Sequence, residues 1–126
     1  MTRSRHTPGK MNTLETAYVN ERLTPMLASG LILGWSFEPI TLKLADQVRY
    51  TPDFLLQMPD GTVELHETKA CRKGGAYLME DDAWVKLKIA DSIFAWMYRF
   101  ARVGRLTKAD GGGWRIDYLR PQATAQ

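Results

Sequence analysis

The sequence predicts an α/β fold in which helices flank a mixed sheet of five strands, in the order α-β-β-β-α-β-β. Three observations predict it. Apolar residues recur at helical spacing near the N-terminus and again over residues 80–96. The segments between and after them are apolar or alternating, and turns that contain Pro or Gly separate them. A helix that crosses between two strands of one sheet requires a parallel pair, so the sheet is expected to be mixed.

The individual elements follow from local signals. Asn12 can cap a first helix, with Glu15 three residues later as the second half of a capping box. Thr24-Pro25 predicts that a second, short helix starts there, and Gly30 is expected to end it. Pro39 predicts a break or an edge position in the first strand. The expected strands are residues 31–45, 48–57, 62–70, 96–103 and 114–119, with a long helix over residues 80–96.

The composition is that of a soluble globular protein, with 44% hydrophobic and 25% charged residues among 126. We expect a flexible basic arm over residues 1–11, a single domain over residues 12–120 and a frayed tail over residues 121–126. No segment approaches the ~18 consecutive apolar residues of a membrane helix, and the basic N-terminus lacks the apolar core of a secretory signal. The single cysteine, Cys71, excludes an internal disulfide and favours a reducing compartment. These features predict a cytoplasmic protein with no membrane partner.

Basic residues gather in three stretches of the chain. The net charge is only +3, so the distribution says more than the total. Such clusters suit an anionic polymer such as a nucleic acid, although solubility is the plainer interpretation of charge alone. The clusters are Arg3, Arg5 and Lys10; Lys69, Arg72 and Lys73; and Arg99, Arg102, Arg105 and Lys108.

The stretch MPDGT over residues 58–62 predicts a hairpin with a three-residue loop whose glycine is left-handed. The ends of this turn then pair, and the same register places Asp53 opposite Glu67. Lys69 is two residues beyond Glu67 and shares its face of the strand. A two-residue loop would instead place Asp53 opposite Thr68.

Two carboxylates directly opposite each other on neighbouring strands repel. Lys69 relieves part of this charge, and a divalent cation would relieve more of it. Carboxylate oxygens are the ligands that Mg²⁺ and Mn²⁺ prefer. The pattern therefore favours a metal site at Asp53 and Glu67, with a surface cluster of salt bridges as the alternative.

Pro52-Asp53, followed after thirteen residues by Glu67-Thr68-Lys69, resembles the signature of the PD-(D/E)XK nuclease superfamily. More narrowly, the stretches YTPDFLL, ETK and DD resemble the endonuclease I of T7-like phages, a resolvase of Holliday junctions, and small phage and prophage nucleases of similar size. The resemblance covers residues 12–103 and implies a restriction-endonuclease-like core.

The resemblance also implies catalytic roles for Asp53, Glu67, Lys69 and Glu15. Asp53 and Glu67 would hold one or two Mg²⁺ ions, for which Mn²⁺ could substitute, and the carbonyl of Thr68 could add an oxygen. Lys69 would orient or help to deprotonate the attacking water. Glu15 matches a helix acid that completes the metal shell in related enzymes, and its role in a capping box carries equal weight.

Basic residues around this signature are the expected contacts to the DNA backbone. Those in the glycine-containing loop after the ETK strand are the strongest candidates. Lys86 lies four residues after Asp82, so an ion pair within the helix is the alternative for it. His66 is on the face opposite Glu67 and is expected to pack or to form hydrogen bonds. The predicted DNA contacts are Arg72, Lys73, Lys86, Lys88, Arg3, Arg5 and Lys10.

The function predicted from these observations is that of an Mg²⁺-dependent DNA endonuclease, with a phage-type Holliday junction resolvase as the first specific expectation. We expect a homodimer acting on branched DNA in the host cytoplasm, because two sites related by two-fold symmetry can cut two strands. The longer hairpin and the inserted stretch CRKGGAY depart from the endonuclease I pattern and leave the substrate open. The alternatives are a related nuclease for another DNA substrate, a non-catalytic DNA-binding protein on the same fold, and an RNA nuclease.

Overall fold

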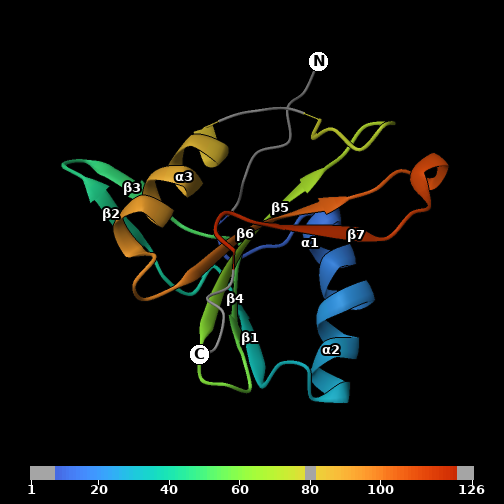
Figure 1. Ribbon diagram of the computed structural model, residues 1–126, viewed down its shortest axis with the longest axis horizontal. Coiled ribbons are helices and arrows are strands. Elements are labelled where there is room, and N and C mark those ends of the chain that lie inside the picture. Colours follow the sequence, from blue (N-terminus) through green and yellow to red (C-terminus); the bar gives the residue numbers. More distant parts are fainter. Residues whose placement is uncertain (1–7, 79–81, 122–126) are drawn as a thin grey trace.

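The computed structural model describes residues 8–78 and 82–121 (Figure 1). Two short helices and one π-helical turn open the chain, five strands follow, and a single long helix precedes the last two strands. The elements are α1 (Thr13–Tyr18), the π-helical turn (Val19–Leu23), α2 (Thr24–Ser29), β1 (Gly34–Phe37), β2 (Leu42–Ala45), β3 (Val48–Tyr50), β4 (Phe54–Gln57), β5 (Val63–Ala70), α3 (Asp82–Phe94), β6 (Arg99–Arg105), a 3₁₀ turn (Lys108–Asp110) and β7 (Trp114–Tyr118).

The predicted α/β class and the mixed sheet of five strands are confirmed. The central sheet has the order β1-β4-β5-β6-β7. β5 and β6 run parallel, and the other neighbours are antiparallel. The parallel pair flanks α3 in sequence, as expected for a strand-helix-strand crossover.

Two hydrophobic cores lie on the two faces of this sheet. On one face, the buried side chains of the α1–α2 segment pack on β4 and β6, with Tyr18 and Phe54 in edge-to-face contact at 5.4 Å between ring centres. On the other face, Leu87 and Ala90 of α3 pack against β5, β6 and the β2–β3 hairpin. The sheet is therefore covered on both sides, which buries the strand that carries Glu67.

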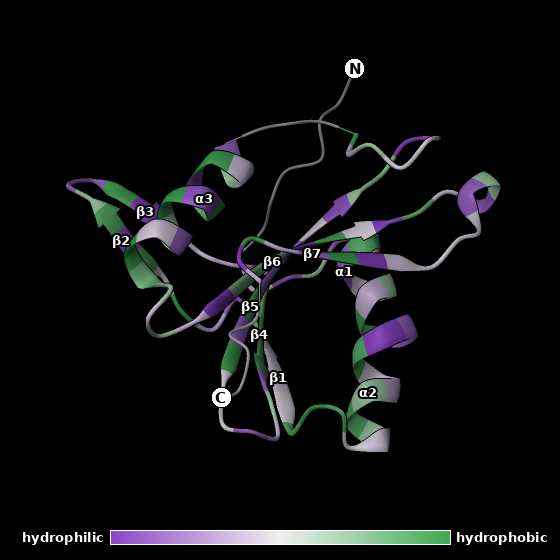
Figure 2. Ribbon diagram, in the orientation of Figure 1, coloured by the Kyte–Doolittle hydropathy of each residue, from purple (hydrophilic) through white to green (hydrophobic). Residues whose placement is uncertain are grey.

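The β2–β3 hairpin changes the expected strands. The break that Pro39 predicts divides residues 31–45 into β1 and β2, whereas residues 48–57, expected to form one strand, also form two. Pro39 and Pro52 interrupt them because proline cannot donate to a strand ladder. The strands β2 and β3, which lie between the two prolines, pair with each other as a separate two-stranded sheet. Figure 2 shows hydrophobic and hydrophilic residues alternating along this hairpin, as expected for a ribbon with one buried face.

The helix signals were mostly correct. The capping box of Asn12 and Glu15 is present, and Gly30 ends α2 with a left-handed φ of 79°. The long helix, expected over residues 80–96, is described over Asp82–Phe94. The strand expected over residues 96–103 runs instead from Arg99 to Arg105. Trp96, the last residue of the expected helix, lies beyond the end of α3 and is 78% exposed.

Parts of the expected terminal arm and tail lie outside the described residues, which start at residue 8 and end at residue 121. Within the described ranges, no helix combines the length and the apolar character needed to span a bilayer.

Candidate active site

The β4–β5 hairpin has the predicted register. Phe54 pairs with His66, and the N–H of Met58 donates to the carbonyl of Thr62 at 2.9 Å. Asp60 closes the turn because its Oδ1 accepts hydrogen bonds from the N–H and the hydroxyl of Thr62. Asp53 lies one residue before β4, and the same register places it opposite Glu67 on β5.

Asp53 is buried and held by the strand that it faces. Its Oδ2 accepts hydrogen bonds from both the N–H and the Oγ1 of Thr68, each at 2.9 Å. Burial raises the pKa of Asp53, and the two bonds from Thr68 lower it only in part. The backbone carbonyl of Asp53 accepts a hydrogen bond from the N–H of Glu38 at 2.9 Å. The carboxyl is thus fixed at the edge of β4.

Glu67 is buried beside it, in the middle of β5. The hydroxyl of Tyr50, on β3, donates to Oε1 of Glu67 at 2.5 Å. Burial and the charge of Asp53 raise the pKa of Glu67 well above its usual 4.5, while the bond from Tyr50 and the charge of Lys69 lower it. The negative charges of the two carboxylates are therefore incompletely compensated by the protein.

Glu15 joins these acids from the first turn of α1. Its Oε1 accepts the N–H of Asn12 at 2.8 Å, which confirms the capping interpretation. Burial, with smaller contributions from the charges of Asp53 and Glu38, raises the pKa of Glu15 from 4.5 to about 7 against the lowering effect of the Asn12 N–H. A hydrogen bond between the side chains of Glu15 and Asp53 adds to the rise. The cap therefore sits next to the acid pair, and its role as a metal ligand stays a prediction.

The carboxylate oxygens of Asp53 and Glu67 are the candidate ligands for a divalent cation. Within residues 8–78 and 82–121, no group of three or more His, Cys, Asp or Glu side chains is already arranged to hold a metal ion. Mg²⁺ does not require one, because it keeps several waters and is usually bound by one or two carboxylates together with substrate phosphates. Thr68 and Tyr50 each fix one oxygen of Asp53 and Glu67, and the side chains of the two acids also share a hydrogen bond, whose proton a metal ion would replace. The chemistry of the pair suits Mg²⁺ or Mn²⁺.

Lys69 lies where the sequence predicts it, two residues beyond Glu67 on the same face of β5. It is half-buried, and its charge lowers the pKa of Glu67. Its neighbour on the parallel strand β6 is Gly104, and the side chains of Cys71 and Tyr77 fill the space beside that glycine. Thr68, the third residue of the predicted metal set, points its hydroxyl to Asp53, so only its carbonyl is a candidate ligand.

The predicted DNA contacts are dispersed rather than gathered at one point. Arg72 and Lys73 are exposed in the loop after β5, and the N–H of Gly74 ties this loop to Asp110 at 2.9 Å. Lys86 is half-buried on α3, and Lys88 is exposed, with its Nζ 5.0 Å from the ring centre of Trp84. Lys10 is exposed before α1, whereas Arg3 and Arg5 fall outside the described residues.

Three residues near the acids were missed by sequence reasoning. Tyr50 donates to Glu67 across 17 positions of the chain. Glu38 has a φ of 48°, which non-glycine residues rarely adopt, and its charge raises the pKa of Asp53. Arg102 is the neighbour of Glu67 on β6, and its guanidinium lies 3.6 Å from the ring centres of both Tyr77 and Trp84. Only the tyrosine carried a usable signal, since it lies three residues before Asp53.

His66 belongs to a separate network on the other face of β5. Its Nδ1 lies 2.8 Å from the hydroxyl of Tyr18, and its Nε2 lies 2.9 Å from Oε1 of Glu64. Burial would raise the pKa of Glu64, but the hydrogen bonds and charges from His66, Tyr118 and Arg99 lower it overall. The predicted hydrogen-bonding role of His66 is confirmed.

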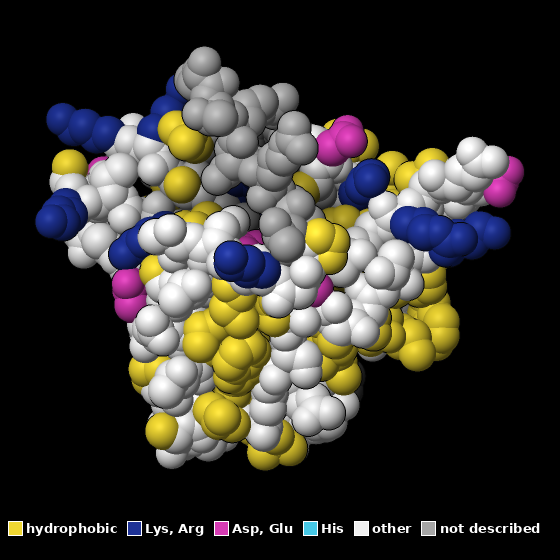
Figure 3. Space-filling model, turned by 180° about the vertical axis from the view of Figure 1, so that it is seen from behind, with side chains coloured by type: hydrophobic (Ala, Val, Ile, Leu, Met, Phe, Trp, Pro, Cys, Tyr) yellow, Lys and Arg dark blue, Asp and Glu magenta, His cyan; other side chains and the backbone are white. Residues whose placement is uncertain are grey.

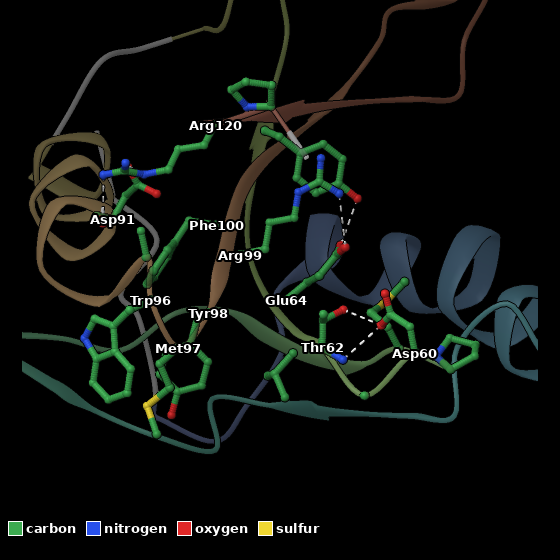
Figure 4. A pocket seen from close by; sticks show the side chains of 17 residues that line it. Asp60, Thr62, Glu64, Asp91, Trp96, Met97, Tyr98, Arg99, Phe100 and Arg120 are labelled. Carbon is green, nitrogen blue, oxygen red and sulfur yellow. Dashed lines mark hydrogen bonds and ion pairs between the residues drawn. The ribbon is translucent and has the colours of Figure 1, made fainter. Parts of the chain in front are cut away.

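A pocket of about 1010 Å³ lies at the other end of β5, beside the β4–β5 turn (Figure 4). None of the acids Glu15, Asp53 and Glu67 lines it. Its charged groups are engaged within the protein: Arg99 lies 3.6 Å from Glu64, Arg120 donates to Asp91 at 2.9 Å, and Asp60 accepts from Thr62. The pocket therefore offers less to a substrate than the acid pair does.

Comparisons of the chain with protein-family models, with curated proteins and with solved structures found no match.

Proposed function

We propose that this protein is an Mg²⁺-dependent DNA endonuclease of the PD-(D/E)XK type with a restriction-endonuclease-like core. The observation that carries the proposal is the pair of buried carboxyls, Asp53 and Glu67, with Lys69 one step along the same face. Two ionised acids are unfavourable when buried together, so the pair must either share a proton or bind a cation. Because these same residues resemble the superfamily signature, the proposed cation would take part in catalysis.

Different side chains would have different roles in phosphodiester hydrolysis. Asp53 and Glu67 would hold the ion between them in place of the proton that they share, and the carbonyl of Thr68 could complete the shell. A bound Mg²⁺ supplies charge stabilisation at the phosphate and lowers the pKa of coordinated water. Lys69 would orient the attacking water and place a positive charge beside the phosphate oxygens.

Branched DNA is the proposed substrate, and a Holliday junction is its most specific form. This rests on the resemblance to phage endonuclease I and on the basic residues Lys10, Arg72, Lys73 and Lys88, which are exposed. A phage or prophage origin with action in the host cytoplasm belongs to the same proposal.

A homodimer fits the need to cut two strands, and α3 offers a surface for it. Four exposed apolar side chains follow the outer face of this helix and its C-terminal end at helical spacing: Val85, Ile89, Ile93 and Trp96. Contiguous exposed apolar surface of this kind is typical of protein interfaces.

The direct test is Mg²⁺-dependent cleavage of a labelled four-way junction, with linear duplex and single strand of the same sequence in parallel. Wild type should cut the junction, and Glu67→Gln and Lys69→Ala should each lower the rate by at least about 100-fold. Glu21→Gln, the same change at an exposed position, serves as the matched control and should retain activity. Absence of cutting by wild type on every DNA would reject the nuclease, whereas equal cutting of junction and duplex would reject only the resolvase.

A further inference from the structure

The β2–β3 ribbon, residues 42–50, has one buried and one basic face. Leu42, Leu44 and Tyr50 are buried against α3 and β5. On the outer face, Lys43 and Arg49 are exposed and are direct partners across the two strands. Figure 1 shows the ribbon projecting beside α3, and the view from behind in Figure 3 shows Lys and Arg side chains on this projection.

This pairing of cations is unfavourable without a counter-charge. Like charges directly opposite each other on antiparallel strands destabilise the pair. Among the residues that the structure describes, neither Lys43 nor Arg49 has an ion pair or a hydrogen bond with an acidic side chain. Asp46 is the one acid of the ribbon and lies in the turn at its tip. The outer face therefore keeps two neighbouring positive charges exposed to solvent.

The basic face is connected to the acid pair by a short stretch of chain. Tyr50 follows Arg49 in sequence, and its hydroxyl donates to Glu67 from the opposite face of the ribbon. The outer face continues through the hydroxyls of Thr41 and Thr51, which are 2.7 Å apart. Arg49 and Asp53 are four positions apart in the sequence, a span of at most ~13 Å in extended chain. That span corresponds to about four base-pair rises of 3.4 Å along duplex DNA.

We propose that the outer face of the β2–β3 ribbon binds the sugar-phosphate backbone of duplex DNA, within about four base pairs of the bond that Asp53 and Glu67 address. This rests on the proposed nuclease function. Lys, Arg and Thr side chains are the groups that proteins use for phosphate contacts. A two-stranded ribbon is also narrow enough to follow a groove of B-form DNA. A duplex arm therefore fits the ribbon better than a flat protein surface or a single strand does.

The test compares two double variants that each remove two positive charges. Lys43→Gln/Arg49→Gln alters the ribbon, and Arg22→Gln/Lys108→Gln alters exposed positions on the π-helical turn and in the β6–β7 connection. Binding of a fluorescent 30-base-pair duplex would be measured by anisotropy over a series of salt concentrations, with Ca²⁺ in place of Mg²⁺. A single-stranded 30-mer and an acidic polymer, polyglutamate, complete the set.

The ribbon variant should bind the duplex at least about tenfold more weakly, with the slope of log K against log salt reduced by about 2, because each phosphate contact contributes about 0.9. The control variant should retain most of the affinity. The ribbon variant should also melt no lower than wild type, since removing two facing charges relieves repulsion. This second measurement separates a binding defect from misfolding.

Four results would overturn the inference: unchanged duplex binding by the ribbon variant, an equal loss in the control variant, a loss confined to single strand or polyglutamate, and no duplex binding by wild type. A reduced slope with no cleavage by wild type would support the ribbon as a DNA surface while rejecting the nuclease. Normal cleavage by wild type with no effect of the ribbon variant would retain the nuclease and reject the ribbon.

Discussion

The hydroxyl of Tyr50 donates a hydrogen bond of 2.5 Å to Oε1 of Glu67, and so joins the small β2–β3 sheet to the central sheet at the acid pair. This contact does two things. It orients one carboxylate oxygen, and it favours the ionised form of an acid whose pKa is otherwise raised by burial and by Asp53.

Tyr50→Phe should therefore raise the pKa of Glu67 further. A hydrogen bond to a charged group contributes about 1.5–3 kcal/mol, which corresponds to about one or two pH units. We expect the acid limb of the cleavage profile to move to higher pH by that amount, and more Mg²⁺ to be needed for half-maximal rate. Tyr98→Phe, at a half-buried tyrosine that packs against the same core, is the control. An unshifted profile in Tyr50→Phe would contradict the assigned role.

The raised acid pKa values predict that metal-free protein loses stability as pH rises. The pKa of Glu15 is about 7 in the folded state and about 4.5 when unfolded. Below pH 4.5 both states are protonated and the contribution is fully present; between pH 4.5 and 7 only the folded state keeps the proton, so the free energy of unfolding falls. Asp53 and Glu67 shift in the same direction.

The decline attributable to Glu15 is at most about 3 kcal/mol, at ~1.4 kcal/mol for each pH unit. Glu15→Gln should flatten the curve obtained from urea denaturation at several pH values, and Glu21→Gln should keep the wild-type shape. Added Mg²⁺ should restore stability at neutral pH. A wild-type curve that rises from pH 4.5 to 7 would show that the acids are ionised and well compensated without metal.

Gly104 has no room for a larger residue. A Cβ at this position would lie 2.6 Å from Sγ of Cys71 and 2.9 Å from a ring carbon of Tyr77. Gly104→Ala should lower the free energy of unfolding by about 1–3 kcal/mol, the usual cost of overpacking. Gly34→Ala is the comparison, because its Cβ would meet only the flexible end of Gln57 at 3.2 Å. Equal stability of the two variants in chemical denaturation would show that the loop around Cys71 shifts to accommodate the added methyl group.

The apolar stripe on α3 predicts the oligomeric state. Wild type should sediment as a dimer at micromolar concentration, and Ile89→Glu should sediment as a monomer because it buries a charge in the interface. Leu33→Glu, at a 62% exposed leucine before β1, should leave the dimer intact. A monomeric wild type, or equal effects of both substitutions, would exclude α3 as the contact.

The β4–β5 register could be predicted because its determinants are local. Asp60 and Gly61 specify the turn within five residues, and the side chain of Asp60 bonds to Thr62 as such turns require. Once that turn is fixed, the alternation of the strands places Asp53 and Glu67 together without further information. The capping box of Asn12 and Glu15 was predictable for the same reason.

The features that escaped prediction depend on contacts between distant segments. The β2–β3 ribbon forms because its leucines pack on α3, which lies about 40 residues later in sequence. The 78% exposure of Trp96 depends on where α3 ends, and apolar spacing alone continued the helix through it. The unusual φ of Glu38 occurs where its N–H donates to the carbonyl of Asp53, 15 positions away in the chain.

The hydrogen bond from Glu38 to Asp53 closes a neck at the base of residues 38–53, since Phe37 and Phe54 on either side are already paired. A segment whose two ends meet in this way behaves as a module. Its tip at residues 45–48 can be lengthened, shortened or exchanged while the neck keeps Asp53 in place. Exchanging only that tip would change how far the ribbon reaches without disturbing Tyr50, Glu67 and Asp53 at its base.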